Sequence, residues 1–452
     1  MPISWRSRDG EPSQVGLDPA RLLAADRAVA AGVRALGDER RTTPDTEALY
    51  AGAVLVVARD GVIVHEAAHG WAATHDGGRP VAAPRAMTAA TRFDLASVSK
   101  VLGTTAAAMH LVDAGQLDLD APVRAALPEM PAGEGRDRLT ARHLLTHRSG
   151  LPPWEPLYLH AREPQAAIAR AASRPLSGPP GGERRYSDVG FILLGELCAR
   201  LAGLPLDALV RERVLDPLGL TATVYLPSRH RVGIPVHTAG IPTRCRSDGV
   251  AATAPGDWHE RRMIASGDPY PVEGHPDDFD AWRTHTLVGE VSDGNAHHAL
   301  GGVAGHAGLF GTARDVAAYG WAVVAGARGA DLPFAGAAAV RAFVTPDPTT
   351  GEALGFWSDP ITGARGRSRP PGSLALALSH SGPRPPGSLA LALSHSGFTG
   401  CELLCDPGSG LVVVLLTNRL HPFGPRRRIG AVWDRVLGAL VGRGGLSGWK
   451  RA

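Results

Sequence analysis

The chain has 452 residues, of which 44% are hydrophobic and 20% charged, so it carries enough apolar material for a buried core, and global disorder is excluded. Its 47 basic and 44 acidic residues are interspersed, and the formal net charge of +3 indicates no nucleic-acid partner. No run reaches the roughly 18 consecutive apolar residues of a membrane-spanning helix, and the polar start shows no signal peptide, so we expect a cytoplasmic protein.

The first predicted elements are a helix and a β-hairpin. Apolar residues recur every three or four positions over residues 17–36, and this spacing predicts the helix. Two runs rich in Val and Ile, 53–58 and 62–68, flank Asp60-Gly61. This dipeptide between such runs is typical of a two-residue hairpin turn.

The middle of the chain is mostly helical, and β character returns toward its end. Helices are predicted from about residue 97 to 113 and from 190 to 202. Strands are predicted at 389–393 and 411–417, and a terminal amphipathic helix is predicted at about 429–441.

Together these elements predict an α+β fold, in which an antiparallel β-sheet flanked by helices is interrupted by an inserted, mostly helical lobe. We expect residues 1–105 and 295–452 to form the sheet-plus-helix lobe and residues 106–294 to form the insert.

One segment is duplicated: residues 369–382 recur identically as 384–397. Prolines follow the first copy, and proline cannot donate hydrogen bonds to a sheet. We therefore expect residues 369–383 to be a surface loop insertion and the second copy to enter the sheet.

A zinc-peptidase signature, H-E-x-x-H, is formed by His65, Glu66 and His69. The motif binds zinc from a helix, where both imidazoles share one face, whereas here it lies on the second arm of the predicted hairpin. On a strand that rises about 3.3 Å per residue, the two histidines are roughly 13 Å apart along the chain, too far to share a zinc ion. A zinc peptidase is therefore only an alternative, and we expect neither a metal nor a cofactor.

Lysine occurs only at Lys100 and Lys450, and each ends an S-x-x-K element. In a helix the serine and the lysine of this element lie one turn apart on the same face, where the amine can activate the hydroxyl. Ser97 opens a predicted helix, whose N-terminus favours the negative charge that develops in acyl transfer. Ser447 lies among glycines near the end of the chain, so the context favours Ser97 and Lys100.

Two further polar motifs are candidates to line a cleft. Tyr186-Ser187-Asp188 precedes an apolar helix, from which position the phenol can project into a cleft. His395-Ser396-Gly397 ends an apolar strand, where the glycine lets a substrate approach the backbone closely.

In this order and at these intervals, the three motifs resemble those of the serine β-lactamase-like family: class C β-lactamases, low-molecular-weight penicillin-binding proteins, and related esterases and D-amino-peptidases. Supporting stretches at 144–152, 300–310 and 412–418 also resemble the family. The resemblance covers roughly residues 15–440 and implies an antiparallel sheet flanked by helices plus a helical lobe.

The resemblance also implies a serine hydrolase that works through a covalent acyl-enzyme. Ser97 would be the acylated nucleophile, and Lys100 would keep its hydroxyl poised for deprotonation. Tyr186 would move the proton as general base and then acid, as a phenolate held by Lys100. The backbone N–H groups of Ser97 and Phe398 would form the oxyanion hole.

Two departures from the family pattern bear on the substrate. His395 stands where β-lactamases and many penicillin-binding proteins have a lysine that receives the substrate carboxylate, and imidazole is a weaker, pH-dependent cation. Asp188 stands where the family usually has asparagine, and an ionised aspartate can only accept hydrogen bonds. We therefore expect a small molecule or short peptide, an ester or D-amino-acid amide rather than a penicillin, bound beside Ser396 and Gly397.

Several alternatives stay open at the sequence level. Three histidines beside a glycine pair either hold a metal or are incidental: His297, His298 and His306. Asp293 and Asn295 are candidates for substrate contacts at the edge of the cleft. A non-catalytic sensor of the penicillin-binding type is a further alternative function, and the sequence makes no prediction about the oligomeric state.

Overall fold

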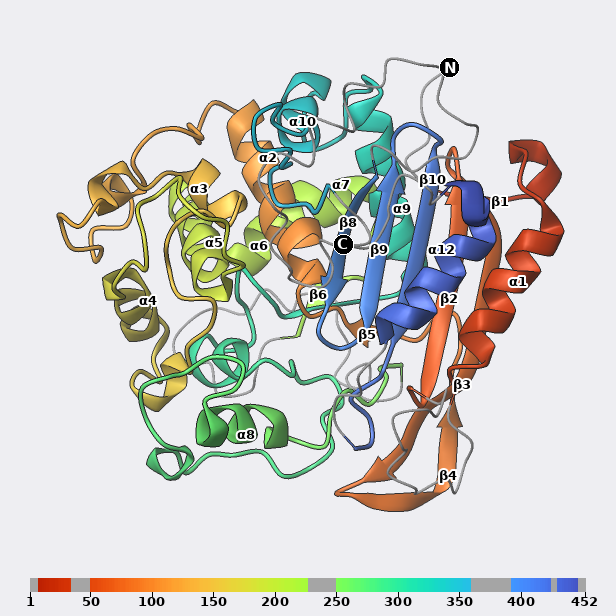
Figure 1. The fold of residues 1–452 in the computed structure, drawn as a ribbon, viewed down its shortest axis with the longest axis horizontal. Helices are drawn as coiled ribbons and strands as arrows, with labels where there is room; N and C mark the ends of the chain where they lie inside the picture. The colour runs from red at the N-terminus through yellow and green to blue at the C-terminus, as the bar shows by residue number, and fades with distance from the viewer. Residues whose placement is uncertain (1–6, 34–48, 227–248, 359–391, 424–428, 446–452) are drawn as a thin grey trace.

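The computed structural model describes residues 7–33, 49–226, 249–358, 392–423 and 429–445 (Figure 1). Within them, helices and a mixed β-sheet form an α+β fold, as the sequence predicts. The duplicated loop predicted at residues 369–383 lies outside the described residues, and the predicted lobe boundaries at residues 105 and 295 stay a prediction.

The main sheet has the strand order β1-β3-β2-β10-β9-β8, with β4 paired to β3. All pairs are antiparallel except β1 with β3. The strands are β1 (Arg8–Asp9), β2 (Gly52–Arg59), β3 (Val62–Asp76), β4 (Arg79–Ala86), β8 (Leu393–Gly397), β9 (Cys401–Asp406) and β10 (Leu411–Thr417).

The predicted hairpin is confirmed. Strands β2 and β3 are joined through Asp60 and Gly61, whose φ angles of 51° and 78° match a turn that requires positive φ at both positions. The strand predicted at 411–417 is also confirmed. Of the strand predicted at 389–393, residues 389–391 lie outside the described residues, and β8 runs from Leu393 to Gly397.

The sheet is buried on both faces because its strands alternate between two hydrophobic clusters. Val54 and Val56 of β2 point to the same side as α9 (Ala313–Ala327), which lies against β2, β9 and β10. Leu55 and Val57 point to the other side, where α1 (Pro19–Ala30) and α12 (Ile429–Gly445) pack side by side (Figure 1). Helix α1 is shorter than predicted, since it begins after Asp18, which caps Ala20, and ends at Ala30.

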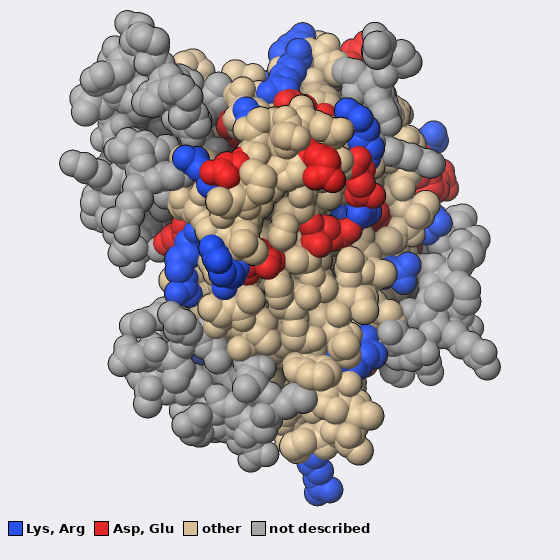
Figure 2. Space-filling model, turned by 90° about the vertical axis from the view of Figure 1, so that its right-hand side faces the viewer, with Lys and Arg blue, Asp and Glu red and all other residues tan. Residues whose placement is uncertain are grey.

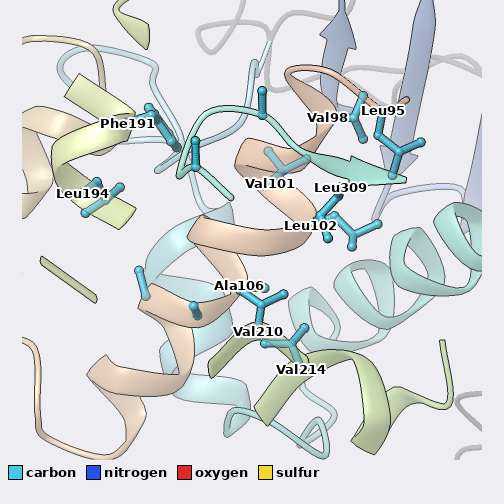
Figure 3. Close-up of a cluster of buried hydrophobic side chains, with 14 of the residues drawn as sticks. Leu95, Val98, Val101, Leu102, Ala106, Phe191, Leu194, Val210, Val214 and Leu309 are labelled. Carbon is cyan, nitrogen blue, oxygen red and sulfur yellow. The ribbon is translucent and has the colours of Figure 1, made fainter. Parts of the chain in front are cut away.

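The helical part is built around a buried central helix that carries Lys100. A wider π-helical turn, Lys100–Thr105, leads into α2 (Ala106–Asp113), and such turns often occur at functional sites. Figure 3 shows apolar side chains of this helix, among them Val101 and Leu102, meeting residues from α5 (Asp188–Ala202) and from the neighbouring helices.

The remaining described elements are short. The helices are α3 (Ala141–Leu145), α4 (Pro164–Ser173), α6 (Leu206–Val210), α7 (Asp216–Leu218), α8 (Trp258–Ser266) and α10 (Ala337–Val344). A second, three-stranded sheet has the order β5 (Phe93–Asp94), β7 (Leu309–Gly311) and β6 (Val224–Tyr225).

No single described helix is long and apolar enough to cross a membrane. The helices 188–202 and 206–218 reach that length and composition only together, with a bend of 77° between them. Charged side chains of both signs are mixed on the face shown in Figure 2, without a large area of one sign.

Candidate active site

A cavity of about 610 Å³ brings together residues from all three sequence motifs. Its lining includes Ser97, Tyr186, Asp188, Ser396, Gly397 and Phe398. The motifs lie far apart in the sequence, so the fold itself assembles this site.

The serine lies on a strained turn in front of the central helix. Strand β5 hydrogen-bonds to β7 and ends just before it, and Asp94 accepts the N–H of Ala96 at 2.9 Å. Ala96 has a φ of 45°, a conformation that costs free energy for a residue with a side chain and that often occurs at functional sites. This turn exposes Ser97 to the cavity and leaves Lys100 fully buried.

The ammonium group of Lys100 donates three hydrogen bonds. Its Nζ lies 2.9 Å from Ser97 Oγ, 2.6 Å from Asp188 Oδ1 and 3.2 Å from the carbonyl oxygen of His306. Burial by itself lowers the pKa of Lys100, but Asp188 and Tyr186 raise it, and the net pKa lies above its ordinary value. The resting site therefore holds an ammonium–carboxylate pair beside the serine.

Tyr186 lies within hydrogen-bonding reach of both Ser97 and Lys100, whose Nζ is 4.9 Å from the ring centre. Burial raises the pKa of the phenol, and the attraction of Lys100 only partly offsets this because Asp188 opposes it. This direction favours a neutral phenol in the unliganded site, whereas the resemblance implies a phenolate.

The ring of Tyr186 is held by two aromatic neighbours that the sequence did not assign to the site. His147 lies 4.5 Å from it between ring centres, and Trp357 stacks on it at 5.6 Å with an angle of 20°. Trp357 is itself fixed to β8, because its N–H and C=O pair with those of Ser394. His147 lies in the stretch 144–152, whose resemblance to the family was the one sequence observation that pointed to this part of the chain.

The end of β8 packs directly against the serine turn. A side chain at Gly397 would bring its Cβ to 2.6 Å from the carbonyl oxygen of Leu95, so only glycine fits there. Thr399 donates from Oγ1 to the carbonyl of Asp94 at 2.8 Å and fastens the two segments together. Phe398 follows Gly397 and lines the same cavity as Ser97, so the two residues predicted to supply the oxyanion donors border one site.

His395 differs from its predicted role as a pH-dependent cation. It is 1% exposed, and burial together with the charge of Lys100 lowers its pKa to about 3. Its Nδ1 contacts the carbonyl of Ser396 at 3.0 Å. The imidazole is therefore neutral at physiological pH, and it offers no positive charge to a substrate carboxylate.

The residues of the H-E-x-x-H motif are divided between the two faces of β3. His65 and His69 both bind Asp26 Oδ1, at 3.1 and 2.8 Å, and tie the strand to α1. Glu66 points to the other side and pairs with Arg314 at 2.5 Å. The two imidazoles thus converge on one carboxylate oxygen and lie closer together than the strand spacing predicts, but Glu66 points to the opposite face, so the three residues do not form one zinc site.

The other histidine candidates also have protein partners. His298 Nε2 contacts Asp257 at 2.9 Å, and His306 Nε2 contacts Asp293 at 2.8 Å. Among the described residues, one group has metal-like spacing, namely Glu155, His160 and Glu273. Arg170 already binds both of its carboxylates, at 2.8 and 2.9 Å, and its charge opposes a metal cation there.

Of the two predicted edge residues, Asp293 lines the cavity, whereas Asn295 is structural. Asn295 is fully buried and accepts the N–H of Leu157 while donating to the carbonyl of Glu155, both at 2.8 Å. Glu260 also lines the cavity. No sequence signal pointed to it, because Asp293 and Gly294, which lie beside it, come from a distant segment.

Known proteins resemble the chain over most of its length. A family model described as Beta-lactamase matches residues 29–436. An N-acetylmuramyl-L-alanine amidase of Bacillus subtilis (strain 168) is 30% identical over 392 residues, covering 83% of this chain and 79% of the relative. A putative D-alanyl-D-alanine carboxypeptidase of Escherichia coli O157:H7 is 29% identical over 429 residues, covering 91% and 86%. Among solved structures, EstCE1, a hydrolase with promiscuous acyltransferase activity, aligns with a TM-score of 0.59 at 22% identity, covering 93% of this chain and 99% of that chain.

Proposed function

The chain belongs to the Beta-lactamase family and is a serine hydrolase that acts on ester or amide bonds, and from this premise we propose that Ser97 forms a covalent acyl-enzyme with its substrate. The observation that carries this proposal is the distance of 2.9 Å between Ser97 Oγ and Lys100 Nζ in the wall of the cavity. An ammonium group at this distance stabilises negative charge on the attacking oxygen.

Tyr186 relays the proton in acylation. Because the phenol is neutral at rest, it accepts the proton of Ser97 while it passes its own to the leaving oxygen or nitrogen. The bond from Ser97 Oγ to the carbonyl carbon forms, the bond to the leaving group breaks, and the phenol ends in the state in which it began. Lys100 stays charged throughout, balanced by Asp188.

The same groups serve deacylation in reverse. A water molecule attacks the acyl carbon and gives its proton to Tyr186, which returns one to Ser97 Oγ as the ester bond breaks. The N–H groups of Ser97 and Phe398 stabilise the oxyanion in both steps, and a donor of this kind typically contributes about 3 to 4 kcal/mol of barrier lowering.

The proposed substrate is an ester or amide. The buried, neutral His395 supplies no positive charge for a β-lactam carboxylate, although Arg419 lines the cavity and donates to the carbonyl of Phe398 just after β8. The relatives named as an amidase and a carboxypeptidase support amide bonds as substrates, and the fold shared with EstCE1 is compatible with esters.

A substrate panel on purified protein tests this function. We expect wild type to hydrolyse p-nitrophenyl acetate faster than nitrocefin, and Ser97→Ala to lower the ester turnover by about 10⁴-fold or more. Ser173→Ala is the matched control, because this exposed serine donates only to the carbonyl of Arg170 within its own helix. Full activity of Ser97→Ala would overturn the proposal, and sensitivity of that residual activity to a chelator would favour the zinc alternative.

A further inference from the structure

Asp94 is a buried acid at the end of β5 that connects three segments around the active site. Its side chain lies in the interior, with 2% of the residue exposed. Its Oδ1 accepts the N–H of Ala96 at 2.9 Å, and its Oδ2 accepts the N–H of Ser292 at 2.7 Å. Its backbone carbonyl accepts the hydroxyl of Thr399 at 2.8 Å. One residue therefore holds the serine turn, the loop around residue 292 and the end of β8 together.

The serine turn needs this support because it is strained. Ala96 has a φ of 45°, and a residue other than glycine keeps such a conformation only where its surroundings enforce it. The hydrogen bond from the N–H of Ala96 to Asp94 spans this turn. Ser97 follows directly, and its carbonyl accepts the N–H of Lys100 at 3.0 Å. A turn that relaxes for want of the bond to Asp94 moves Ser97 relative to the amine of Lys100.

The bond to Ser292 links the same carboxylate to the surroundings of the lysine. Ser292 lines the cavity and precedes Asp293, whose carboxylate contacts Nε2 of His306 at 2.8 Å. The carbonyl oxygen of His306 accepts from Lys100 Nζ at 3.2 Å. The carboxylate of Asp94 thus supports the serine through one N–H group and the acceptor of the lysine through the other.

Only an ionised carboxylate suits this arrangement of donors. Both N–H groups donate, and a carboxylate accepts at each of its two oxygens. In a protonated carboxyl one oxygen carries a hydrogen, which then faces an N–H donor instead of accepting from it. Neutralising Asp94 therefore weakens one of the two bonds, and a buried N–H group that loses its acceptor costs free energy.

The surroundings of Asp94 bring its protonation into an accessible pH range. Burial raises the pKa of Asp94 to about 6, because it outweighs the effect of the two N–H donors. The charge of Asp293 raises this pKa further, whereas that of Arg283, which is paired with Asp257 at 2.5 Å, lowers it. The thiol of Cys401 lies 3.5 Å from the carbonyl of Asp94 and stays neutral, since burial raises its pKa to about 12.

We propose that Asp94 is a positioning residue of this site: its carboxylate holds Ser97 in the reactive place, and its protonation in mild acid lowers turnover. Asp94 does not line the cavity, so it acts through the backbone of Ala96 and Ser292. This inference rests on the proposed function and adds its regulation by pH to it.

The pH dependence of p-nitrophenyl acetate turnover tests this role. The reaction is followed at a wavelength where nitrophenol and nitrophenolate absorb equally. We expect kcat of the wild type to fall by about tenfold from pH 7.5 to pH 5, where about one tenth of a carboxyl with a pKa near 6 is ionised.

Asp94→Asn is expected to remove this acid limb of the profile. Its amide oxygen can accept only one of the two N–H groups, so kcat at pH 7.5 falls by about tenfold to hundredfold with KM little changed. Because the amide does not titrate, kcat of the variant then stays constant to within about twofold between pH 5 and pH 7.5.

Asp315→Asn is the matched control. Asp315, in the first turn of α9, also accepts two donors from another segment, namely the N–H of Ala222 and the hydroxyl of Thr223, both at 2.9 Å. None of these three residues lines the cavity, so the acid limb of this variant stays as in wild type.

Asp293→Asn is the second variant, and it tests the proposal even if thermal melting shows that Asp94→Asn is unfolded. Because the charge of Asp293 raises the pKa of Asp94, its removal moves the midpoint of the acid limb to lower pH by about 0.5 pH units. An acid limb that is absent from wild type, that persists in folded Asp94→Asn, or that stays in place or disappears in Asp293→Asn overturns the role of Asp94. Failure of the proposed function is distinct, because it appears earlier, as ester turnover that does not depend on Ser97.

Discussion

His147 positions Tyr186 by holding the residues that precede and follow it in the sequence. Its carbonyl oxygen accepts the N–H of Arg185 at 2.8 Å, and its Nδ1 accepts the N–H of Ser187 at 3.1 Å. Burial lowers the pKa of the imidazole well below its ordinary value, so Nδ1 remains an acceptor. Its φ of 58° lets backbone and side chain face the same segment, which makes His147 a positioning residue for the proton relay.

Replacing His147 is expected to affect turnover more than substrate binding. His147→Phe keeps an aromatic ring beside Tyr186 but loses the acceptor for the N–H of Ser187. Because the phenol of Tyr186 is then displaced from Ser97, we expect kcat to fall by about tenfold to hundredfold with KM little changed. His147→Asn tolerates the positive φ and retains an acceptor, so it should recover part of the activity. The measurement is kcat per covalently labelled site, and a loss that vanishes after this normalisation would indicate a merely structural role.

Lys100 illustrates what a single residue can reveal in the sequence. Both lysines of the chain end an S-x-x-K element, so the spacing alone was no proof, and Lys100 became a specific signal only together with the motifs of Tyr186 and His395. The structure explains its retention: a fully buried compact ammonium reaches three acceptors there, and a planar guanidinium could not occupy that space in the same way. The neutral states of Tyr186 and His395 were not predictable, since they depend on burial by distant segments.

At the scale of elements, the junction between β8 and the serine turn would set the geometry of the proposed oxyanion hole. Gly397 is the contact point, because its backbone lies against the carbonyl of Leu95. A methyl group there pushes the end of the strand, and with it the N–H of Phe398, away from Ser97.

Gly397→Ala is therefore expected to lower kcat for p-nitrophenyl acetate by about hundredfold, comparable to the loss of an oxyanion donor. Gly178→Ala is the control, since no atom lies within 4 Å of a Cβ at that position. Circular dichroism and turnover are measured for both variants. Wild-type turnover in a folded Gly397→Ala protein would contradict the assigned role of this junction.

Helices and strands that are determined by local interactions were predictable, whereas the contacts between segments distant in the sequence were not. The Asp60-Gly61 hairpin and the strand at 411–417 follow from turn chemistry and β-branched runs. The contact of Trp357 with β8 joins segments whose sequences carry no pairing signal. The same holds for the approach of Glu260 to Gly294.

At the scale of the whole molecule, the buried carboxyl group of Glu260 makes the stability of the fold depend on pH. Glu260 has an ordinary pKa of 4.5, and burial together with Asp293 and Asp257 raises it in the folded protein. The folded state thus retains a proton that the unfolded chain has released above pH 4.5, and stability falls as the pH rises through this range.

Glu260→Gln removes this ionisation, so its melting temperature relative to wild type should rise between pH 5 and pH 7.5. The expected change is about 2 °C or more in favour of the variant at the higher pH. Differential scanning calorimetry at both pH values measures it. A difference between variant and wild type that is the same at pH 5 and pH 7.5 would contradict a raised pKa for this carboxyl.

The family and the α+β fold were predictable from three short motifs. Each motif alone is a weak indication, but their order and spacing together are specific. Both predictions are confirmed. The substrate was less predictable. His395 indicated a departure from β-lactam chemistry, but the sequence could not place Glu260 and Asp293 in the same cavity.

Covalent labelling tests the central claim, nucleophilic attack by Ser97, most directly. Wild-type protein is treated with a fluorophosphonate, digested and mapped by mass spectrometry, with Ser97→Ala treated in parallel. We expect one adduct per chain, on the peptide that contains Ser97, and none in the variant. An adduct on another serine with Ser97 unmodified, or equal labelling of the variant, would contradict the account.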